Sequence, residues 1–534
     1  MSDETPQLNR PRRIRWPVAI GIVVASGLLL GVLQLPDVFS NDAHRNLATI
    51  AAALLTGGAL LFWAVFLTGF SAAARMRLML ACAAVAVAVI SLVRIDEVSG
   101  NLVPSFAWRW TAKPDETLTQ QTRQSDVSAG AGTVNLAETS DHDFPQFLGK
   151  TRDARVTGLR LARDWQKRPP RELWRQPIGA GWSGFAVVGD FAVTQEQRGP
   201  DEMITCYELA TGLPRWSHAD ETRFSSIMGG DGPRATPTID RGRVYAVGAS
   251  GDFVCLDGAT GELLWRHDLL TQHQAKLPEW GISRSPLIVG DRVVVSAGGP
   301  NGHSLVAYDC ETGDLVWHAG NQPSSYASPI FATLLDTPQI LMVNQQQLAA
   351  HAPDDGHLLW QFPWPGGEPK VPDPIPIGSD RVLIAAGYGL GCKLLQLDRA
   401  NEVEVEVKLI WENRLLKPKF TNIVVRDDAI YGLDDGRTLV CLNLTDGKLR
   451  WRGGRYGHGQ LLLADDLLLV QSEAGEIALV EATPKRFHEL TRFTALGGKT
   501  WNTPALAGRY LLVRNAAEAA CYELPVEEVQ RAIE

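Results

Sequence analysis

The sequence predicts an all-β fold, an eight-bladed β-propeller of four-stranded blades, preceded by an N-terminal α-helical transmembrane region. Two observations support this prediction. After position 170 a tryptophan recurs about every 40–50 residues, a period typical of propellers and solenoids. Before residue 100, three long runs of residues carry no charge. The chain therefore has at least two regions, one suited to a bilayer and one to water.

Residues 1–97 are expected to form a membrane anchor with three transmembrane helices, at about 16–36, 47–70 and 78–94. The first two runs reach the ~20 apolar residues that a bilayer core requires. The third is shorter and needs Arg77 and Arg94 to extend toward the interface. A cleaved signal peptide would explain only the first run.

The arginines around these runs predict the orientation. Four of them, Arg10, Arg12, Arg13 and Arg15, precede the first run, and Arg75 and Arg77 lie between the second and third. The positive-inside rule then places the N-terminus in the cytoplasm. With three spans, the region after Arg94 lies on the periplasmic, outer side of the inner membrane. If the third run does not span, the large domain is cytoplasmic instead.

Residues 98–143 are polar, and most of the stretch lacks an apolar period. We expect a flexible polar linker there, joining the anchor to the domain at 144–528.

The recurring tryptophan stands at the end of phrases such as CLDGATGELLW at 255–265. A Thr-Gly or Asp-Gly turn precedes it, and short β-rich runs fill the rest of each unit. We expect the tryptophan to lie between neighbouring sheets, with its one N–H group hydrogen-bonded. The structural tryptophans are Trp174, Trp216, Trp265, Trp317, Trp360, Trp411 and Trp451.

The two chain ends are expected to close the ring. The last unit has three strands, and the first tryptophan phrase, at 171–178, is a fourth strand without partners. Pairing of 171–178 with 515–525 would complete an eighth blade. One unit lacks the tryptophan and has Glu489 or Leu490 in its place. The cysteines before the tryptophans are expected to be small buried residues.

These units resemble the pyrroloquinoline-quinone-type (PQQ-like) repeat of eight-bladed propellers, over about residues 144–525. The segment DFPQFLGKTRDARVTG resembles the lead-in of membrane-anchored bacterial members. The resemblance implies one of two functions, a quinoprotein dehydrogenase or a non-enzymatic scaffold such as the outer-membrane assembly propeller. The fold does not choose between them.

A ligand of a propeller should meet the loops that lead into the inner strands. Five of these eight loops carry Arg or Lys, which predicts a positive funnel mouth with aromatic walls and suggests an anionic ligand. The stacking candidates in these walls are Trp182, Trp280, Tyr326 and Trp501. In a purely structural interpretation the same residues only bridge blades. The ligand-binding candidates are Trp182, Arg198, Arg234, Arg284, Tyr326, Lys419, Asn422, Arg455, His458, Lys499, Trp501 and Asn502.

The resemblance to quinoproteins implies a calcium ion, a catalytic Asp and often two adjacent cysteines. The sequence has no Cys-Cys pair, and the plausible carboxylates, Glu196, Asp231, Glu279 and Asp373, fall in no transferable motif. No catalytic residue, metal site or cofactor is therefore predicted, although PQQ with calcium stays possible. The net charge of −9 argues against a nucleic-acid partner.

The sequence thus favours a membrane-anchored, non-enzymatic binding or scaffold protein of the cell envelope, with envelope proteins as partners. The alternatives are a PQQ-dependent dehydrogenase and a sensor of an anionic ligand in the funnel.

Overall fold

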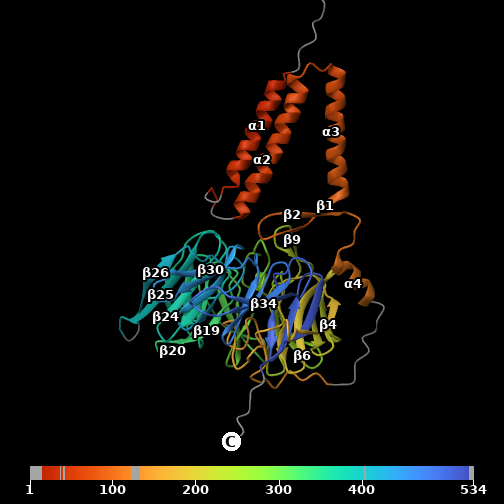
Figure 1. The fold of residues 1–534 in the computed structure, drawn as a ribbon. Coiled ribbons are helices and arrows are strands. Elements are labelled where there is room, and N and C mark those ends of the chain that lie inside the picture. Colours follow the sequence, from red (N-terminus) through yellow and green to blue (C-terminus); the bar gives the residue numbers. More distant parts are fainter. Residues whose placement is uncertain (1–14, 36–37, 40–41, 123–132, 402–403, 528–534) are drawn as a thin grey trace, which may run out of the picture. The chain divides into compact units, whose positions relative to one another are not determined.

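The computed structural model describes residues 15–35, 38–39, 42–122, 133–401 and 404–527. The chain divides into two compact units, Met1–Ala112 and Lys113–Glu534. The first unit is mostly helical and the second is a β-propeller (Figure 1).

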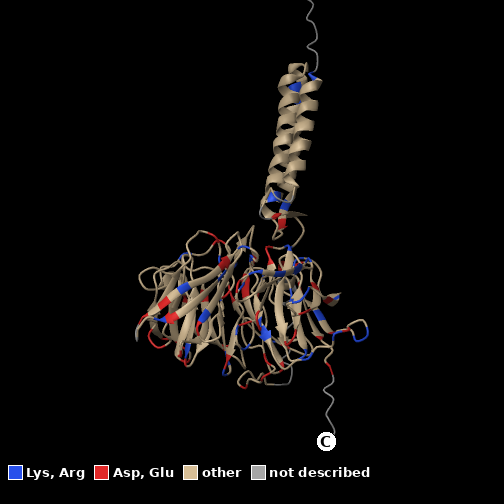
Figure 2. Cartoon of the chain, turned by 60° about the vertical axis from the view of Figure 1, so that its left-hand side comes forward, with Lys and Arg blue, Asp and Glu red and all other residues tan. Residues whose placement is uncertain are grey.

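Three helices form most of the first unit: α1 (Trp16–Leu33), α2 (Asp42–Phe62), which the single π-helical turn η1 (Trp63–Leu67) extends, and α3 (Ala72–Leu92). All three are long and apolar enough to cross a membrane. Their charged residues lie near their ends, and the middle of the helices carries none (Figure 2).

Helix α3 has 21 residues and starts earlier than the predicted span at 78–94. Ser71 caps it by accepting a hydrogen bond from the backbone N–H of Ala74 at 3.3 Å. Its first turns accommodate Arg75 and Arg77, which the sequence places outside the span. The helix ends at Leu92, and a β-strand begins at the next residue, Val93.

The predicted flexible linker at 98–143 includes regular elements, although most of its described residues are in turns and irregular backbone. It contains the end of β1 (Val93–Val98), the strand β2 (Pro104–Trp108) and the helix α4 (Pro114–Thr122). Val134 and Leu136 are buried in a core cluster of the propeller, and the backbone O of Leu136 accepts a hydrogen bond from Gly242 N at 3.1 Å. Residues 123–132 lie outside the described residues.

The first four blades are regular four-stranded antiparallel sheets. Their strands, from the axis outward, are β5 (Ala186–Val188), β6 (Phe191–Arg198), β7 (Asp201–Glu208) and β8 (Pro214–Asp220); β11 (Thr238–Asp240), β12 (Arg243–Val247), β13 (Asp252–Asp257) and β14 (Leu263–Asp268); β15 (Leu287–Val289), β16 (Arg292–Ser296), β17 (Leu305–Asp309) and β18 (Leu315–Ala319); and β19 (Ile330–Leu334), β20 (Thr337–Val343), β21 (Gln347–His351) and β22 (Leu358–Pro363). Between blades 1 and 2 lies a small hairpin of β9 (Ser225–Ser226) and β10 (Gly230–Asp231), and α5 (Leu269–Gln272) follows blade 2.

The next three blades repeat the design. Their strands are β23 (Ile375–Ile377), β24 (Arg381–Ala386), β25 (Gly391–Arg399) and β26 (Val405–Asn413); β27 (Val424–Arg426), β28 (Ala429–Asp434), β29 (Thr438–Asn443) and β30 (Leu449–Gly453); and β31 (Gln460–Ala464), β32 (Leu467–Gln471), β33 (Glu476–Glu481) and β34 (Glu489–Thr494). A short strand, β3 (Arg155–Val156), adds to blade 7 in parallel with β31.

The eighth blade combines both ends of the propeller sequence. It consists of β35 (Ala505–Ala507), β36 (Tyr510–Arg514), β37 (Glu518–Glu523) and β4 (Arg171–Pro177). Trp174 lies opposite Cys521 in this sheet. The predicted fold class, an eight-bladed propeller of four-stranded blades after N-terminal helices, is thereby confirmed.

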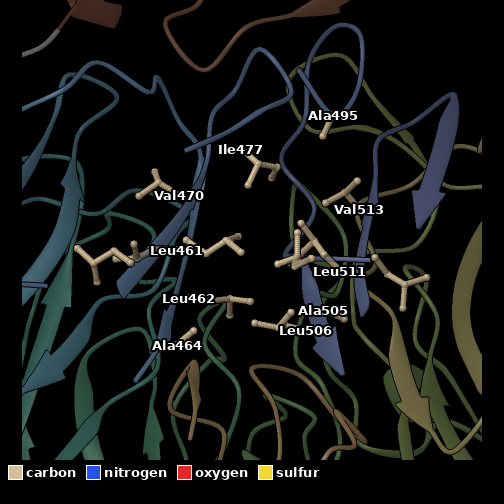
Figure 3. Packing of buried hydrophobic residues seen from close by; sticks show 14 of the residues in the cluster. Leu461, Leu462, Ala464, Val470, Ile477, Ala495, Ala505, Leu506, Leu511 and Val513 are labelled. Atoms are coloured by element: carbon tan, nitrogen blue, oxygen red, sulfur yellow. The ribbon is translucent and has the colours of Figure 1, made fainter. Parts of the chain in front are cut away.

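The blades pack through apolar side chains from facing sheets. Between blades 7 and 8, Leu462 of β31 approaches Leu506 of β35 and Leu511 of β36 (Figure 3). Burial of such surface stabilises by roughly 25 cal/mol per Å². Four cysteines, Cys206, Cys255, Cys441 and Cys521, are buried opposite tryptophans, as expected for small core residues.

Six of the seven repeat tryptophans tie their blade to the next one. Trp317, for example, donates from Nε1 to the backbone O of Pro353 at 2.9 Å and packs on Gly356 in the turn of blade 4. The equivalent donors are Trp174, Trp216, Trp265, Trp411 and Trp451. Trp360 differs, because its Nε1 donates to Gln339 Oε1 within its own blade.

The blade without a tryptophan has Thr491 at this position, not Glu489 or Leu490. Thr491 lies opposite Leu479, as Trp451 lies opposite Cys441 in the preceding blade. The prediction was wrong because the turn between β33 and β34 is longer: Thr491 follows its partner Leu479 by 12 residues, whereas Trp451 follows Cys441 by 10.

The segment before β4, residues 144–162, crosses the ring. Phe144 bridges to Val187 of blade 1, Pro145 O accepts from Ile239 of blade 2, and Arg152 donates to backbone carbonyls of blade 3. The segment then pairs with blade 7 through β3 and reaches blade 8, where Ala162 N donates to Pro525 O. It therefore runs across one face, which we call the lower face.

Candidate functional site

The opposite face, the upper face, carries the loops that lead into the inner strands. Polar side chains in these loops form a chain of hydrogen bonds around the axis, because each accepts from a backbone N–H of the preceding blade. The bonds are Gly184 N to Thr236 Oγ1 at 3.1 Å, Thr236 N to Ser285 Oγ at 3.0 Å, Ser285 N to Ser328 Oγ at 3.1 Å, Ser328 N to Asp373 Oδ1 at 2.7 Å and Asp373 N to Asn422 Oδ1 at 2.8 Å.

Amide side chains complete this axial ring. Gln460 Nε2 donates to the backbone O of Phe420 at 2.9 Å and of Trp501 at 2.8 Å. Asn502 Nδ2 donates to the backbone O of Ser183 at 2.8 Å, which returns the chain to blade 1. Asn422 and Asn502, both predicted site residues, therefore hold blades together. The sequence analysis named Asp373 only as a possible calcium ligand and did not include the other members among the ligand-binding candidates, although a Thr, Ser or Asp directly before proline marks four of them.

Above the axial ring lies a rim of six half-buried aromatic side chains. These are Trp182, Trp280, Tyr326, Tyr388, Phe420 and Trp501. The four aromatic residues that the sequence analysis named as stacking candidates, Trp182, Trp280, Tyr326 and Trp501, are in this aromatic rim. Tyr388 and Phe420 were not among them.

The rim consists of two contiguous halves. In one half the ring centroids of Trp182 and Trp501 are 5.0 Å apart, and those of Trp501 and Phe420 are 4.7 Å apart. In the other, Trp280 stacks on Tyr326 at 5.3 Å and lies 6.2 Å from Tyr388. Such contacts are worth roughly 0.5–1.5 kcal/mol each, so the rim is pre-organised.

Most of the predicted positive funnel mouth is taken up by structural contacts. Arg284 is 2% exposed and donates to the backbone O of Ser296 at 2.9 Å and of Ser325 at 3.0 Å. Arg234 donates to three carbonyls of the loop at 229–232 and lies 4.4 Å from the Phe224 ring centroid. Burial lowers the pKa of each guanidinium to about 10, so both stay charged at neutral pH.

Two further cations are paired with carboxylates. Lys419 is 5% exposed and lies 3.3 Å from Asp435, which is 1% exposed. Arg198 donates to Glu196 Oε1 at 2.9 Å at the end of β6. Charge neutralisation inside the protein therefore weakens the field that the sequence predicts.

Lys499 and Arg455 are the candidate cations nearest to solvent. The Lys499 ammonium lies 4.4 Å from the ring centroid of Trp501 and 4.9 Å from that of Trp182, within cation–π distance of both rings. Arg455 is exposed. His458 is buried, its ring 5.0 Å from that of Phe420, and its backbone N–H donates to Glu473.

The β9–β10 hairpin adds an apolar tip beside the rim. Ile227 is 72% exposed and Met228 is 38% exposed, both large values for such side chains. The next residue, Gly229, accepts through its backbone O from Trp182 Nε1 at 2.6 Å. A Cβ on Gly229 would lie 3.2 Å from Cβ of Trp280. The hairpin thus bridges the two halves of the rim.

The carboxylates named for calcium do not converge. Glu196 is fully buried; burial alone would raise its pKa, but the charge and hydrogen bond of Arg198 lower it to about 2. Asp231 binds Lys113 at 2.5 Å and Arg223 at 3.0 Å. Burial raises the pKa of Asp373 to about 7 against the attraction of Arg152, and Glu279 is exposed. Calcium takes six to eight oxygen ligands, so these residues do not fit it.

Comparisons with known proteins agree with the repeat pattern. A family described as "Outer membrane protein assembly factor BamB" matches residues 200–407. The outer membrane protein assembly factor BamB of Shewanella oneidensis is 23% identical over 363 residues, which cover 64% of this chain and 86% of that protein. Residues 200–407 of this propeller therefore resemble the repeats of that family.

Solved structures share this PQQ-type propeller fold. The quinohemoprotein alcohol dehydrogenase of Comamonas testosteroni superposes with a TM-score of 0.55 at 14% identity, over 79% of this chain and 86% of that one. A europium-containing methanol dehydrogenase gives 0.54 at 13% identity, over 72% and 91%. At such identities the likeness shows the fold alone.

Proposed function

We propose that this PQQ-type propeller is a non-enzymatic binding protein of the cell envelope that holds partner proteins on its upper face. The observation that carries the proposal is the aromatic rim with the exposed Ile227–Met228 tip beside it. Aromatic residues and Met are enriched in protein interfaces and supply contact area at low entropic cost.

The chemistry of the site supports binding over catalysis. Glu196, Asp231 and Lys419 are held in ion pairs, and Asp373 accepts a backbone hydrogen bond in the axial ring. A general acid or base must instead reach a substrate proton. The described carboxylates also lack the arrangement that calcium and a quinone would need, so we propose no cofactor.

The relative in Shewanella oneidensis is named as an assembly factor for outer membrane proteins. That name supports a scaffold role among envelope proteins for this chain too. Its three apolar helices would restrict it to one membrane, which raises its effective concentration toward partners there.

For the orientation we propose three membrane spans with the propeller on the periplasmic side of the inner membrane. The 21 residues of α3 correspond to about 31 Å of helix, close to the ~30 Å bilayer core. Fusing alkaline phosphatase, which is active only outside the cytoplasm, after residue 534 tests this. Phosphatase activity is expected for the fusion after residue 534. Phosphatase activity only in a fusion made after residue 70 would refute the proposed orientation.

Photocrosslinking in intact cells tests the binding role. A photoreactive amino acid replaces Ile227 on the upper face, and in the matched control it replaces exposed Glu311 in the β17–β18 turn on the lower face. We expect a discrete protein adduct at 227, lost when Trp280→Ala is added, and none at 311. Equal labelling at both positions would refute the upper-face assignment.

The competing function is a quinoprotein dehydrogenase, which shares the fold. Titrating the purified protein with pyrroloquinoline quinone and Ca²⁺ while following dye reduction with alcohols separates the two. Saturable binding with turnover would overturn the non-enzymatic proposal.

A further inference from the structure

A two-stranded hairpin follows the last apolar helix without any intervening residue. Helix α3 ends at Leu92 and β1 begins at Val93. If α3 crosses the bilayer, as proposed above, the chain enters this hairpin at the depth of the lipid headgroups. We propose that the β1–β2 hairpin lies in that interfacial zone and binds lipid through one apolar face.

The hairpin runs across the end of the helical unit. Its turn reaches the start of α2, where Asn46 Nδ2 donates to the backbone O of Asn101 at 2.9 Å. The start of α2 and the end of α3 lie at the same end of the three-helix unit (Figure 1). Because the hairpin joins these two helix ends, it lies transverse to helices that cross the membrane, and therefore along the membrane surface.

One face of the hairpin is apolar. Directly opposed residues of an antiparallel pair point to the same side of the sheet. The pairs Val93–Trp108 and Ile95–Phe106 therefore share one face. Trp110 joins them, because its ring is stacked on that of Trp108 with centroids 5.0 Å apart and planes 9° from parallel.

These side chains lack cover, and their large exposure makes this face unusual. Ile95 is 49% exposed, Phe106 65%, Trp108 51% and Trp110 67%. The opposite face carries Arg94, whose guanidinium lies 3.3 Å from Asp96. A two-stranded hairpin alone is marginally stable in water, so an apolar surface that covers this face would stabilise it.

Lipid is the occupant that the position favours. Tryptophan is enriched at membrane interfaces because its ring is apolar and its N–H group can meet the headgroups. A second tryptophan pair lies at the other end of the helices, where the rings of Trp16 and Trp63 are 5.5 Å apart. Trp63 Nε1 donates to the backbone O of Arg15 at 3.0 Å. The helical unit thus has tryptophan pairs at both ends, as expected for a segment with two interfaces.

Adjacent positions on the two faces give a matched test. In the full chain with Cys82→Ser, a fluorescent label is attached at Phe106→Cys or at Ser105→Cys, since Ser105 is also exposed but has the opposite parity. The other six cysteines are buried. Vesicles of phosphatidylethanolamine and phosphatidylglycerol carry phosphatidylcholine spin-labelled near the headgroup or deep in the chain. A third label at Val87→Cys, 63% exposed on α3, reports on the anchor itself.

The shallow spin label should quench position 106 at least twofold more than position 105, and more than the deep spin label does. Equal quenching at 105 and 106, or quenching of neither while Val87→Cys is quenched, would overturn the proposal but leave the anchor intact. Protection of position 106 from aqueous iodide without lipid quenching would show that protein covers this face, which also refutes it. Failure at Val87→Cys would refute the membrane anchor.

Discussion

Replacing Gly356 with alanine should loosen the junction between blades 3 and 4. Gly356 has φ of +76° and lies in the turn between β21 and β22. A Cβ there would be 2.5 Å from Cε3 of Trp317, a distance that real Cβ atoms essentially never show. Trp317 can retreat only by straining its hydrogen bond to Pro353 O at 2.9 Å.

The magnitude has two parts. The left-handed backbone conformation costs alanine about 1–2 kcal/mol. Overpacking against a buried ring adds about 1–3 kcal/mol. The control is Gly290→Ala in the β15–β16 turn, where φ is +65° and a Cβ would meet nothing within 4 Å. This control isolates the backbone part, so the two variants should differ by about 1–3 kcal/mol.

Thermal unfolding of the full-length protein in detergent, followed by tryptophan fluorescence, measures the difference. One kcal/mol corresponds to about 2–4 °C in domains of 150–250 residues and to less in this larger unit. We expect Gly356→Ala to unfold a few degrees below Gly290→Ala. Equal midpoints would refute the idea that the tryptophan and the turn of the next blade are closely packed.

Three other perturbations address the axis, the closure of the ring and a histidine cluster. Burial raises the pKa of Asp373 to about 7, so its carboxyl group stays protonated in the folded protein at pH values where it ionises in the unfolded chain. As the pH rises from 4 to 7, the free energy of unfolding of the wild type should fall by up to about 4 kcal/mol relative to that of Asp373→Asn. The difference between the two unfolding midpoints should fall accordingly. Arg514 is buried in β36 and donates to Thr194 Oγ1 and to two backbone carbonyls before or within blade 1. Arg514→Met should therefore destabilise the closed ring by about 3–5 kcal/mol. An unchanged midpoint of thermal unfolding would contradict this. Burial and the neighbouring His303 lower the pKa of His273 to about 4. As the pH falls from 6.5 to 4, the free energy of unfolding should therefore fall by about 3 kcal/mol on account of this histidine. His273→Gln should flatten that part of the pH profile of stability.

The fold could be predicted because the same local requirement recurs. A turn glycine and a tryptophan at fixed spacing, as at Gly356 and Trp360, repeat in most units and set the blade length. The exception at Thr491 was misplaced because the sequence analysis assumed the usual spacing of ten residues, whereas the β33–β34 turn is two residues longer than the β29–β30 turn. The hairpin after α3 was missed, although the alternation in FAWRW at 106–110 is visible in the sequence.

The candidate site was predicted less well. The sequence indicates which loops surround the axis, and two of its candidates, Trp182 and Trp501, lie together in the aromatic rim. It cannot tell whether a cation in such a loop faces solvent or the backbone. Arg284 is buried because nearby carbonyls of blades 3 and 4 need donors, a demand that appears only once the blades are assembled.

The pairing of β4 with β37 also has a consequence for biosynthesis. Tyr522 and Glu172, which meet across this junction at 2.9 Å, are 350 residues apart in the chain. During translation β4 emerges first and must wait, its edge unpaired, until nearly the whole propeller has left the ribosome. Such edges recruit wrong partners, so a nascent chain of this protein should depend on chaperones until its last strand arrives.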